Sequence, residues 1–233
     1  MFSDIHGNKP ALNTVLREIE IEKPDRVICL GDLVGYGPWP NEVIETIKQK
    51  NIPTIRGNYD EGVGYDSDDC GCAYLTEEER VNGQRSIEWT KAHVSSENKV
   101  WLKNLKNDIK IEVDGTNVLF VHGSPRRINE YLYDNRPSES LLRMLKPLAV
   151  DLLVCGHTHK PYHRIIDGIH IINCGSVGKP RDGDPRACYA LIIIEENIDV
   201  DFRKVSYPTE MVANEILRVG LPEAFADSVL TGS

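Results

Sequence analysis

The sequence predicts an α/β protein in which a second β-sheet packs on the first. Short β-branched runs alternate with amphipathic helical stretches through the first half of the chain, which is typical of a sheet with crossover helices. Several strand-like runs follow one another near the C-terminus without helices between them, which favours the second sheet. The 233 residues suit one large domain that can bury a full core.

The first half supplies two predicted strands and two predicted helices. Buried strands are expected at residues 26–30 (RVICL) and 52–56 (IPTIR). The first helix begins near Asn8, with Pro10 in its opening turn, and its apolar face consists of Ala11, Leu12, Val15, Leu16 and Ile19. The second helix opens at Pro40–Asn41 and buries Val43, Ile44 and Ile47.

Residues 61–105 interrupt this alternation. An acidic, glycine-containing loop (EGVGYDSDDCGC) leads into two predicted helices at about 76–92 and 95–104. The second of them starts from Ser95 or Ser96, because serine is a preferred N-cap residue. We expect this helical, cap-like insert to cover the mouth of a site.

The later half is rich in strands. A helix capped by Ser138 is predicted between the strands at 117–121 and 151–155. The final hairpin turns at Asn197. The strands are predicted at residues 109–113, 117–121, 151–155, 162–166, 169–173, 187–194 and 198–205. Residues 1–205 thus form the main domain, and residues 206–233 form a C-terminal helical extension.

Composition and charge narrow the functional classes. The net charge of −9 argues against stable binding to nucleic acid or to an anionic membrane. It does not exclude a phosphorylated substrate, because bound metals set the local field of a metal site. No apolar run reaches the ~18 residues of a membrane span, no signal peptide is evident, and the cysteines lack the spacing of a disulfide framework. These features predict a cytoplasmic protein.

Five short motifs concentrate Asp, His and Asn directly after predicted strands. They are D-x-H at residues 4–6, G-D-L-V-G at 31–35, G-N-Y-D at 57–60, V-H-G at 121–123 and G-H-T-H at 156–159. Strand ends of an open α/β sheet meet in one crevice, so these side chains can converge. Carboxylate, imidazole and amide oxygen together suit divalent Mn, Fe, Zn or Ni, and we favour Mn.

A single Asp or His at a strand end is more often a cap or a solvated side chain, and a single G-D-x-x-G is a weak turn signal. Four of the seven histidines fall in these motifs, together with two aspartates and one asparagine. Capping does not explain so many metal-type residues in one region, and a metal site does.

The ordered set of motifs resembles the calcineurin-like metallophosphoesterase superfamily, and it is most similar to small phosphodiesterases of the YfcE-like type. Further similarity lies in residues 173–178 (NCGSVG) and 180–187 (PRDGDPRA), so that the resemblance covers about residues 1–205. It implies a four-layer α/β/β/α sandwich of two mixed sheets flanked by helices.

The resemblance also implies a ligand set. One metal would be held by Asp4, His6 and His159, the other by Asn58, His122 and His157, and Asp32 would bridge the two. A water shared by the two metals loses a proton easily, because coordination lowers its pKa toward ~7, and the resulting hydroxide attacks phosphorus. Arg181 and Arg186 are the candidates for further phosphate contacts, since guanidinium groups match phosphate oxygens. Alternatively, both arginines belong to a solvated Gly/Pro loop.

Three features depart from the family pattern. Tyr59 occupies a position where many relatives carry a histidine that protonates the leaving oxygen, while the neighbouring Asp60 is retained. A phenol is a poorer acid than imidazole, so either Tyr59 is a weak acid suited to leaving groups that are stable as anions, or it is a packing residue.

Only three residues precede Asp4, which should leave the strand unpaired and Asp4 loosely held. Cys174 stands where relatives often have proline.

The sequence therefore predicts a binuclear-metal phosphoesterase that hydrolyses phosphodiester or phosphoanhydride bonds of small molecules, including nucleotides. One alternative is a non-catalytic protein-binding scaffold of the same fold, which complete ligand motifs argue against. The other is a protein phosphatase, whose bulky substrate the 61–105 insert would obstruct.

Overall fold

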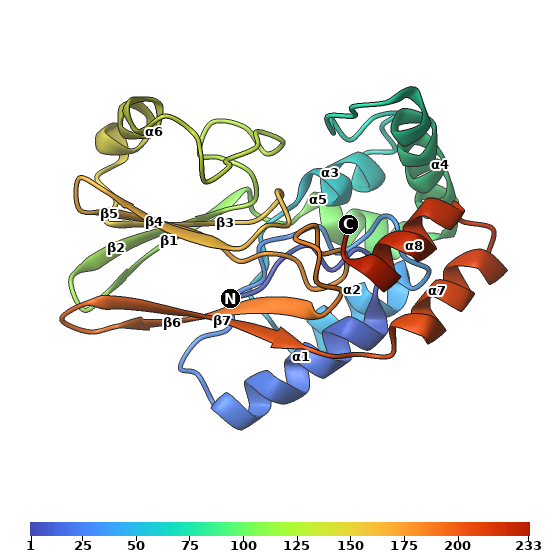
Figure 1. Ribbon diagram of the computed structural model, residues 1–233, viewed down its shortest axis with the longest axis horizontal. Helices are drawn as coiled ribbons and strands as arrows, with labels where there is room; N and C mark the ends of the chain where they lie inside the picture. Colours follow the sequence, from blue (N-terminus) through green and yellow to red (C-terminus); the bar gives the residue numbers. More distant parts are fainter.

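Two stacked β-sheets form one part of the computed structural model, which describes residues 1–233; they lie on the left of Figure 1, between α6 (Ser138–Leu145) and α1 (Lys9–Glu22). The larger sheet has five strands in the order β1-β2-β3-β5-β4. Its central strands β2, β3 and β5 are parallel, whereas the edge strands β1 and β4 are antiparallel to their neighbours. The strands are β1 (Asp108–Val113), β2 (Thr116–Val121), β3 (Leu152–Cys155), β4 (Tyr162–Ile166) and β5 (Ile169–Asn173).

The second sheet is the antiparallel hairpin of β6 (Ala187–Ile194) and β7 (Ile198–Val205), with Asn197 in its turn as predicted. Apolar side chains fill the space between the sheets. Phe120, Val154 and Ile172 come from the larger sheet and pack with Ala190 of β6 in one buried cluster. The larger sheet is mixed, as the sequence predicted, and the two regular strands of the second sheet are antiparallel.

The predicted strands at 26–30 and 52–56 are wrong as strands, because each is reduced to isolated parallel bridges. Cys29 donates to the carbonyl of Pro53 over 2.9 Å and accepts from Ile55 over 3.0 Å, so the two segments are extended and aligned. Pro53 has no N–H to extend the ladder. Each segment also leaves the sheet early, at Gly31 with φ +91° and at Gly57, where a helix begins.

The first residues are better paired than the sequence suggested. The first residue exchanges two hydrogen bonds with Ala190, at 2.7 and 2.9 Å, and Phe2 forms a parallel bridge with Cys29. The N–H of Asp4 then donates to the carbonyl of Gly31 over 3.0 Å. The expectation that Asp4 is loosely held is therefore wrong.

Helices predicted from apolar periodicity are present, among them α1 (Lys9–Glu22), α2 (Pro40–Gln49), α4 (Glu77–His93) and α5 (Ser96–Lys103). Asn8 caps α1 by accepting from the N–H of Ala11 over 3.2 Å, and Ser95 caps α5 in the same way. The C-terminal region forms α7 (Thr209–Arg218) and α8 (Glu223–Thr231).

Two helical details differ from expectation. The helix α6 (Ser138–Leu145), which runs into a short 3-10 turn (Lys146–Leu148), begins at Ser138, but Pro137 is its N-cap residue. The Ser138 hydroxyl instead accepts from Arg164 over 3.1 Å, so the predicted cap is wrong. The helix α3 (Asn58–Gly64) was not predicted, because two of its seven residues are glycine and its apolar periodicity is short.

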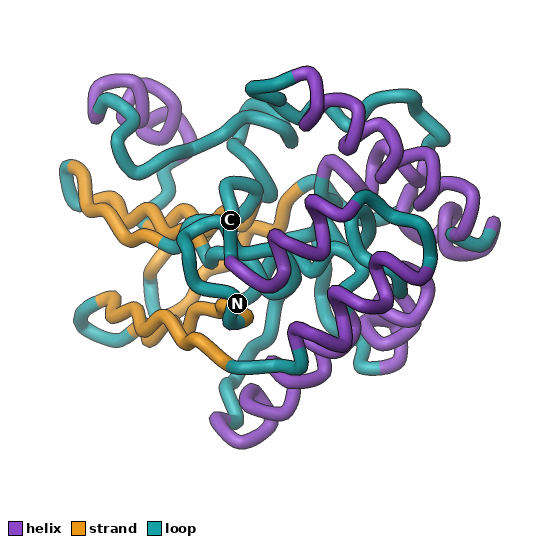
Figure 2. Tube along the Cα trace, turned by 45° about the vertical axis from the view of Figure 1, so that its right-hand side comes forward, coloured by secondary structure: helices purple, strands orange, loops and turns teal.

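Helices cover both outer faces of the sheets. α6 packs on the larger sheet through Leu141 and Leu145, which share a buried cluster with Leu153. α1 lies against β6, through Leu12 and neighbouring apolar residues. The remaining helices gather at the end of the sheets where the parallel strands finish (Figure 2). None of the helices combines the length and hydropathy that crossing a membrane requires.

Candidate metal centre

All seven predicted metal ligands lie at that helix-covered end and are buried. His122 directly follows β2, His157 comes two residues after β3, and Asn58 is the first residue of α3. The other ligands follow bridged or turning segments. Exposed fractions are at most 3% for each of Asp4, His6, Asp32, Asn58, His122, His157 and His159.

The first cluster contains Asp4, His6 and His159. The Nε2 atoms of the two histidines are 3.1 Å apart, and Asp4 Oδ1 lies 3.3 Å from His159 Nε2. Main-chain carbonyls hold the other ring nitrogens. Val34 accepts at 3.0 Å from His6 Nδ1, and Lys179 accepts at 2.5 Å from His159 Nδ1.

These carbonyls fix the tautomers in the first cluster. Because a carbonyl only accepts, both Nδ1 atoms carry the proton, and both Nε2 atoms present a lone pair. Asp4 Oδ1 is also buried without a hydrogen-bond partner. Three acceptors thus face one another with no donor between them. That arrangement is unfavourable unless a cation occupies the space.

The second cluster contains Asp32, His122 and His157, with Asn58 beside them. His122 Nδ1 donates to the carbonyl of Leu30 over 2.8 Å. Its Nε2 faces Asn58 Oδ1 at 3.0 Å and Asp32 Oδ2 at 3.4 Å. His157 Nε2 is buried without a partner. Here, too, acceptor atoms converge.

The orientation of Asn58 is set by the insert. Its amide nitrogen donates to the carbonyl of Cys70 over 3.0 Å and to Cys72 Sγ over 3.3 Å. These contacts turn the amide oxygen toward the second cluster. The insert therefore helps to build the site as well as to cover it.

Asp32 lies between the clusters. Its Oδ2 is 3.4 Å from His122 Nε2 and 3.7 Å from His6 Nε2, so one oxygen faces both groups. Its Oδ1 accepts from the N–H of Tyr59 over 2.8 Å. A carboxylate in this position can serve two cations at once.

Burial and neighbouring charge set the protonation of the site. Burial lowers the pKa of both His6 and His157 to about 3, so their imidazoles are neutral, as metal ligands must be. Burial also disfavours charge on His122, but the Asp32 carboxylate outweighs it and raises the His122 pKa to about 9. Without a metal, a proton on His122 therefore supplies positive charge among the acceptor atoms. The raised pKa of His122 indicates that the surrounding carboxylates favour a cation at this place.

Five of the seven residues adopt the left-handed backbone conformation, which is uncommon for residues other than glycine. The φ angles are 56° for Asp4, 48° for His6, 52° for Asp32, 66° for His157 and 60° for His159. Such strain is concentrated at functional sites, where surrounding structure enforces it. Together with the orphaned acceptors, it shows that these residues fit two divalent cations.

The comparison with known protein families agrees with this geometry. Residues 1–197 match the calcineurin-like phosphoesterase superfamily domain. The chain belongs to this superfamily. The resemblance inferred from the ordered motifs is confirmed.

Three known proteins align over the whole chain. An uncharacterized protein from Methanocaldococcus jannaschii is 33% identical over 250 aligned residues, which cover 100% of this chain and 97% of the relative. The crystal structure of a metallophosphoesterase from Sphaerobacter thermophilus is 31% identical with a TM-score of 0.78, and it covers 100% and 97% of the two chains. A hypothetical protein from Pyrococcus horikoshii shares the fold, with 23% identity, a TM-score of 0.86 and the same coverage.

Tyr59 and Asp60 both lie beside the two clusters. The Tyr59 ring packs against those of Tyr36 and His6, with centroids at 4.8 and 5.5 Å, and its hydroxyl has no hydrogen-bond partner. Burial raises the Tyr59 pKa well above its usual value near 10. Asp60 accepts from the N–H groups of Leu33 and Gly57, both at 2.9 Å, and so ties together the loops that carry Asp32 and Asn58.

The structure separates the two predicted arginines. Arg181 lines a cavity of about 370 Å³ next to the clusters. Arg186 does not line this cavity, and its half-exposed guanidinium forms a bidentate pair with Asp184, with contacts of 2.7 to 3.1 Å.

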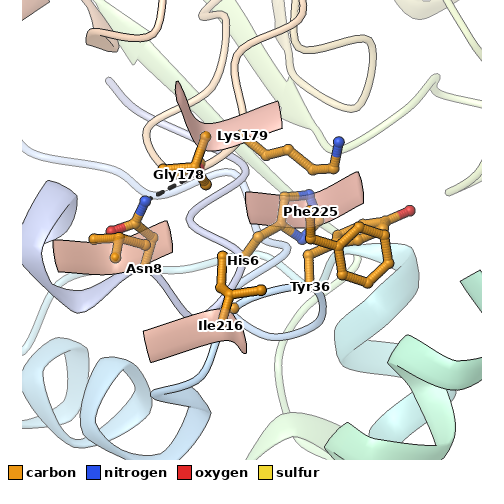
Figure 3. A pocket seen from close by; sticks show the side chains of 10 residues that line it. His6, Asn8, Tyr36, Gly178, Lys179, Ile216 and Phe225 are labelled. Atoms are coloured by element: carbon orange, nitrogen blue, oxygen red, sulfur yellow. Dashed lines mark hydrogen bonds between the residues drawn. The ribbon is translucent and has the colours of Figure 1, made fainter. Parts of the chain in front are cut away.

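Lys179 and Tyr36 are site residues that the motifs did not reveal. Figure 3 shows both next to His6, with Lys179 extending toward the side of the Tyr36 hydroxyl. The Lys179 ammonium lies 5.1 Å from the Tyr36 ring centre and donates to Ser228 over 2.9 Å. Burial lowers its pKa to about 7. The run G-K-P-R at 178–181 is the available signal, but phosphate-binding chemistry predicts a role only for its arginine.

Proposed function

We propose that this chain is a binuclear-metal phosphoesterase that hydrolyses phosphodiester or phosphoanhydride bonds of small phosphorylated molecules. The observation that carries the proposal is the convergence of buried acceptor atoms into two adjacent groups, with Asp32 facing both. Membership of the phosphoesterase superfamily supports it.

We assign one metal to Asp4, His6 and His159, the other to Asn58, His122 and His157, and the bridging position to Asp32. The mixture of carboxylate, amide oxygen and imidazole favours manganese, with iron, zinc or nickel as alternatives. When bound, two such cations supply Lewis-acid stabilisation of phosphoryl oxygens and an activated water.

The chain's own residues restrict the leaving group. Tyr59 is a weak proton donor, because its hydroxyl is buried, has no partner and has a raised pKa. A leaving group that is stable as an anion, such as a phosphate released from an anhydride, needs little protonation, whereas an alkoxide needs much. Arg181 is suited to hold a further phosphate, and Asp60 is a positioning residue for the ligand loops.

The architecture supports one further assignment. The bridges of Phe2 to Cys29 and of Cys29 to Thr54 continue from β6 through the first residue, and we assign these segments to a second mixed sheet of a four-layer α/β/β/α fold. The 61–105 insert and the 206–233 extension are then additions to a 1–205 core.

The function is tested with chelator-treated protein reloaded with Mn²⁺ and supplied with an aryl phosphodiester, an alkyl phosphodiester, a dinucleoside polyphosphate and a phosphopeptide. We expect the aryl ester and the anhydride to be hydrolysed well, the alkyl ester poorly and the phosphopeptide hardly at all. If the protein holds two Mn²⁺ per chain but hydrolyses none of the four substrates, the result would support the non-catalytic scaffold instead.

A further inference from the structure

The cavity of about 370 Å³ beside the metal clusters is enclosed by parts of the chain that lie far apart in sequence. The insert contributes Tyr74, the loop after β2 contributes Tyr131 and Tyr133, and α8 contributes Phe225. The segment 179–181 completes the wall. A volume of this size lies within the ~300–1,000 Å³ range of small-molecule sites.

Three wall residues each contact a different histidine of the clusters. The Tyr131 ring lies over that of His157, with centroids 4.0 Å apart, and the Tyr36 ring meets that of His6 at 4.9 Å. The Lys179 carbonyl accepts from His159. The cavity therefore borders the two clusters through these three residues.

The chemistry of the wall is aromatic and cationic. Four tyrosines line the cavity, Tyr36, Tyr74, Tyr131 and Tyr133. The Tyr131 and Tyr133 rings are nearly parallel, with an interplanar angle of 8° and centroids 5.6 Å apart. Tyr133 is 43% exposed, so part of its ring surface is free for a ligand.

Two cations, Lys179 and Arg181, also line the cavity, and Glu79 is the one acidic side chain among the lining residues. The Lys179 ammonium uses one N–H for Ser228 and has two more to offer. Both cations belong to the segment that holds His159 through a main-chain carbonyl. Phosphates next to the clusters would therefore meet positive charge, and groups farther away would meet aromatic rings.

We propose, building on the phosphoesterase function above, that the substrate is a nucleotide whose phosphate chain lies along Lys179 and Arg181 and whose base stacks in the tyrosine-lined cavity. Base–aromatic stacking tolerates any base, because every base has a π-face. An inorganic polyphosphate or a sugar phosphate has no base to stack on the five aromatic rings of the wall, which are the four tyrosines and Phe225.

The test compares ATP with inorganic tripolyphosphate, which carries the same kind of anhydride bond but no base. For the Mn²⁺-loaded protein, kcat/KM for ATP should exceed that for tripolyphosphate by at least about tenfold, as expected from stacking of one base. Tyr133→Ala should reduce this ratio by roughly five- to tenfold or more, whereas Tyr133→Phe, which keeps the ring, should restore it.

Tyr65→Ala is the matched control. Tyr65 is a tyrosine of the insert that is 53% exposed and does not line the cavity. Its loss should leave the ratio unchanged. Equal kcat/KM values for ATP and tripolyphosphate in the wild type would overturn the proposal. Equal effects of Tyr65→Ala and Tyr133→Ala on the ratio would also overturn it.

A binding measurement separates this inference from the activity. Isothermal titration of metal-free protein should show AMP binding at least about tenfold more tightly than ribose 5-phosphate, because only AMP carries a base. Selective AMP binding by a protein that hydrolyses nothing would support the cavity assignment and overturn the activity. Hydrolysis of aryl phosphodiesters without any preference for AMP or ATP would overturn the cavity assignment alone.

Discussion

The two clusters of the metal centre are built in different ways. In the first, both histidines donate a hydrogen bond to a main-chain carbonyl, His6 to that of Val34 and His159 to that of Lys179. In the second, only His122 is held by such a hydrogen bond, to the carbonyl of Leu30. Asn58 depends on the insert through Cys70 and Cys72, and His157 rests against Tyr131 with a free Nε2.

The difference indicates that the two metal positions are unequal in rigidity. A ligand held by the backbone is preorganised, whereas a ligand held by an insert moves when the insert moves. The first position should therefore bind its cation more tightly. The second position, which borders the cavity through His157 and Tyr131, should exchange its cation more readily and sense what occupies the cavity.

The largest expected effect comes from the residue that the clusters share. Asp32→Asn should lower kcat by on the order of 10³-fold or more, because one change weakens both cation positions. Asp4→Asn changes a ligand of one position, although Asp4 Oδ2 also accepts from the main-chain N–H of His157, and should cost about tenfold less. Equal losses in folded variants with equal metal content would contradict the shared role of Asp32.

Metal titration measures the inequality directly. We expect two Mn²⁺ per chain, with dissociation constants that differ by roughly 10- to 100-fold, the range in which outer contacts alter metal affinity. Elemental analysis during stepwise chelation should show one metal leaving before the other. His157→Ala should abolish the weaker step and His159→Ala the tighter one, and loss of both metals in a single step would refute the comparison.

A smaller effect is expected from the contact between insert and ligand. Cys72→Ala removes the sulfur that Asn58 contacts at 3.3 Å and leaves the Cys70 carbonyl in place. The weaker metal position should lose roughly tenfold in affinity and the tighter one should not change. Cys188→Ala is the matched control, because this buried cysteine lies in β6. An equal loss in the control would show that the insert does not support Asn58.

The smallest effect is expected at Tyr59. Tyr59→Phe removes a hydroxyl that has no hydrogen-bond partner and keeps the ring packed against Tyr36 and His6. Turnover of an alkyl phosphodiester, whose leaving group most needs a proton, should stay within about threefold of the wild type, since a general acid would be worth ~10²–10⁴-fold. A loss of two orders of magnitude in kcat would identify Tyr59 as the proton donor.

The sequence predicts those parts of the site that are encoded locally. Asp4 and His6, or His157 and His159, lie two residues apart at a strand end, so their convergence follows from the general geometry of α/β sheets. The clasping carbonyls of Val34 and Lys179 leave no signal, because any residue type offers a carbonyl and the contact depends on tertiary structure.

The same reason accounts for the errors in the fold. The segments at 26–30 and 52–56 have the residue composition of strands. How far they pair depends on where each segment turns away from the sheet, which their composition does not encode. The cavity also escaped prediction. Tyr74 and Tyr131 are unremarkable residues of loops until the fold brings the insert and the loop after β2 together.

The left-handed backbone at five ligand positions bears on how such a chain changes over generations. Glycine would adopt these φ angles without strain, so replacing Asp4 or His6 by glycine should relieve roughly 1–2 kcal/mol of backbone energy. It would also remove one of the mutually repelling acceptors. Glycine would, however, leave the Tyr59 N–H without the Asp32 acceptor and the Val34 carbonyl without the His6 donor. Each orphaned group costs about 1–3 kcal/mol, so a lineage released from metal binding gains no stability by this route and has no reason to drift toward glycine at these positions.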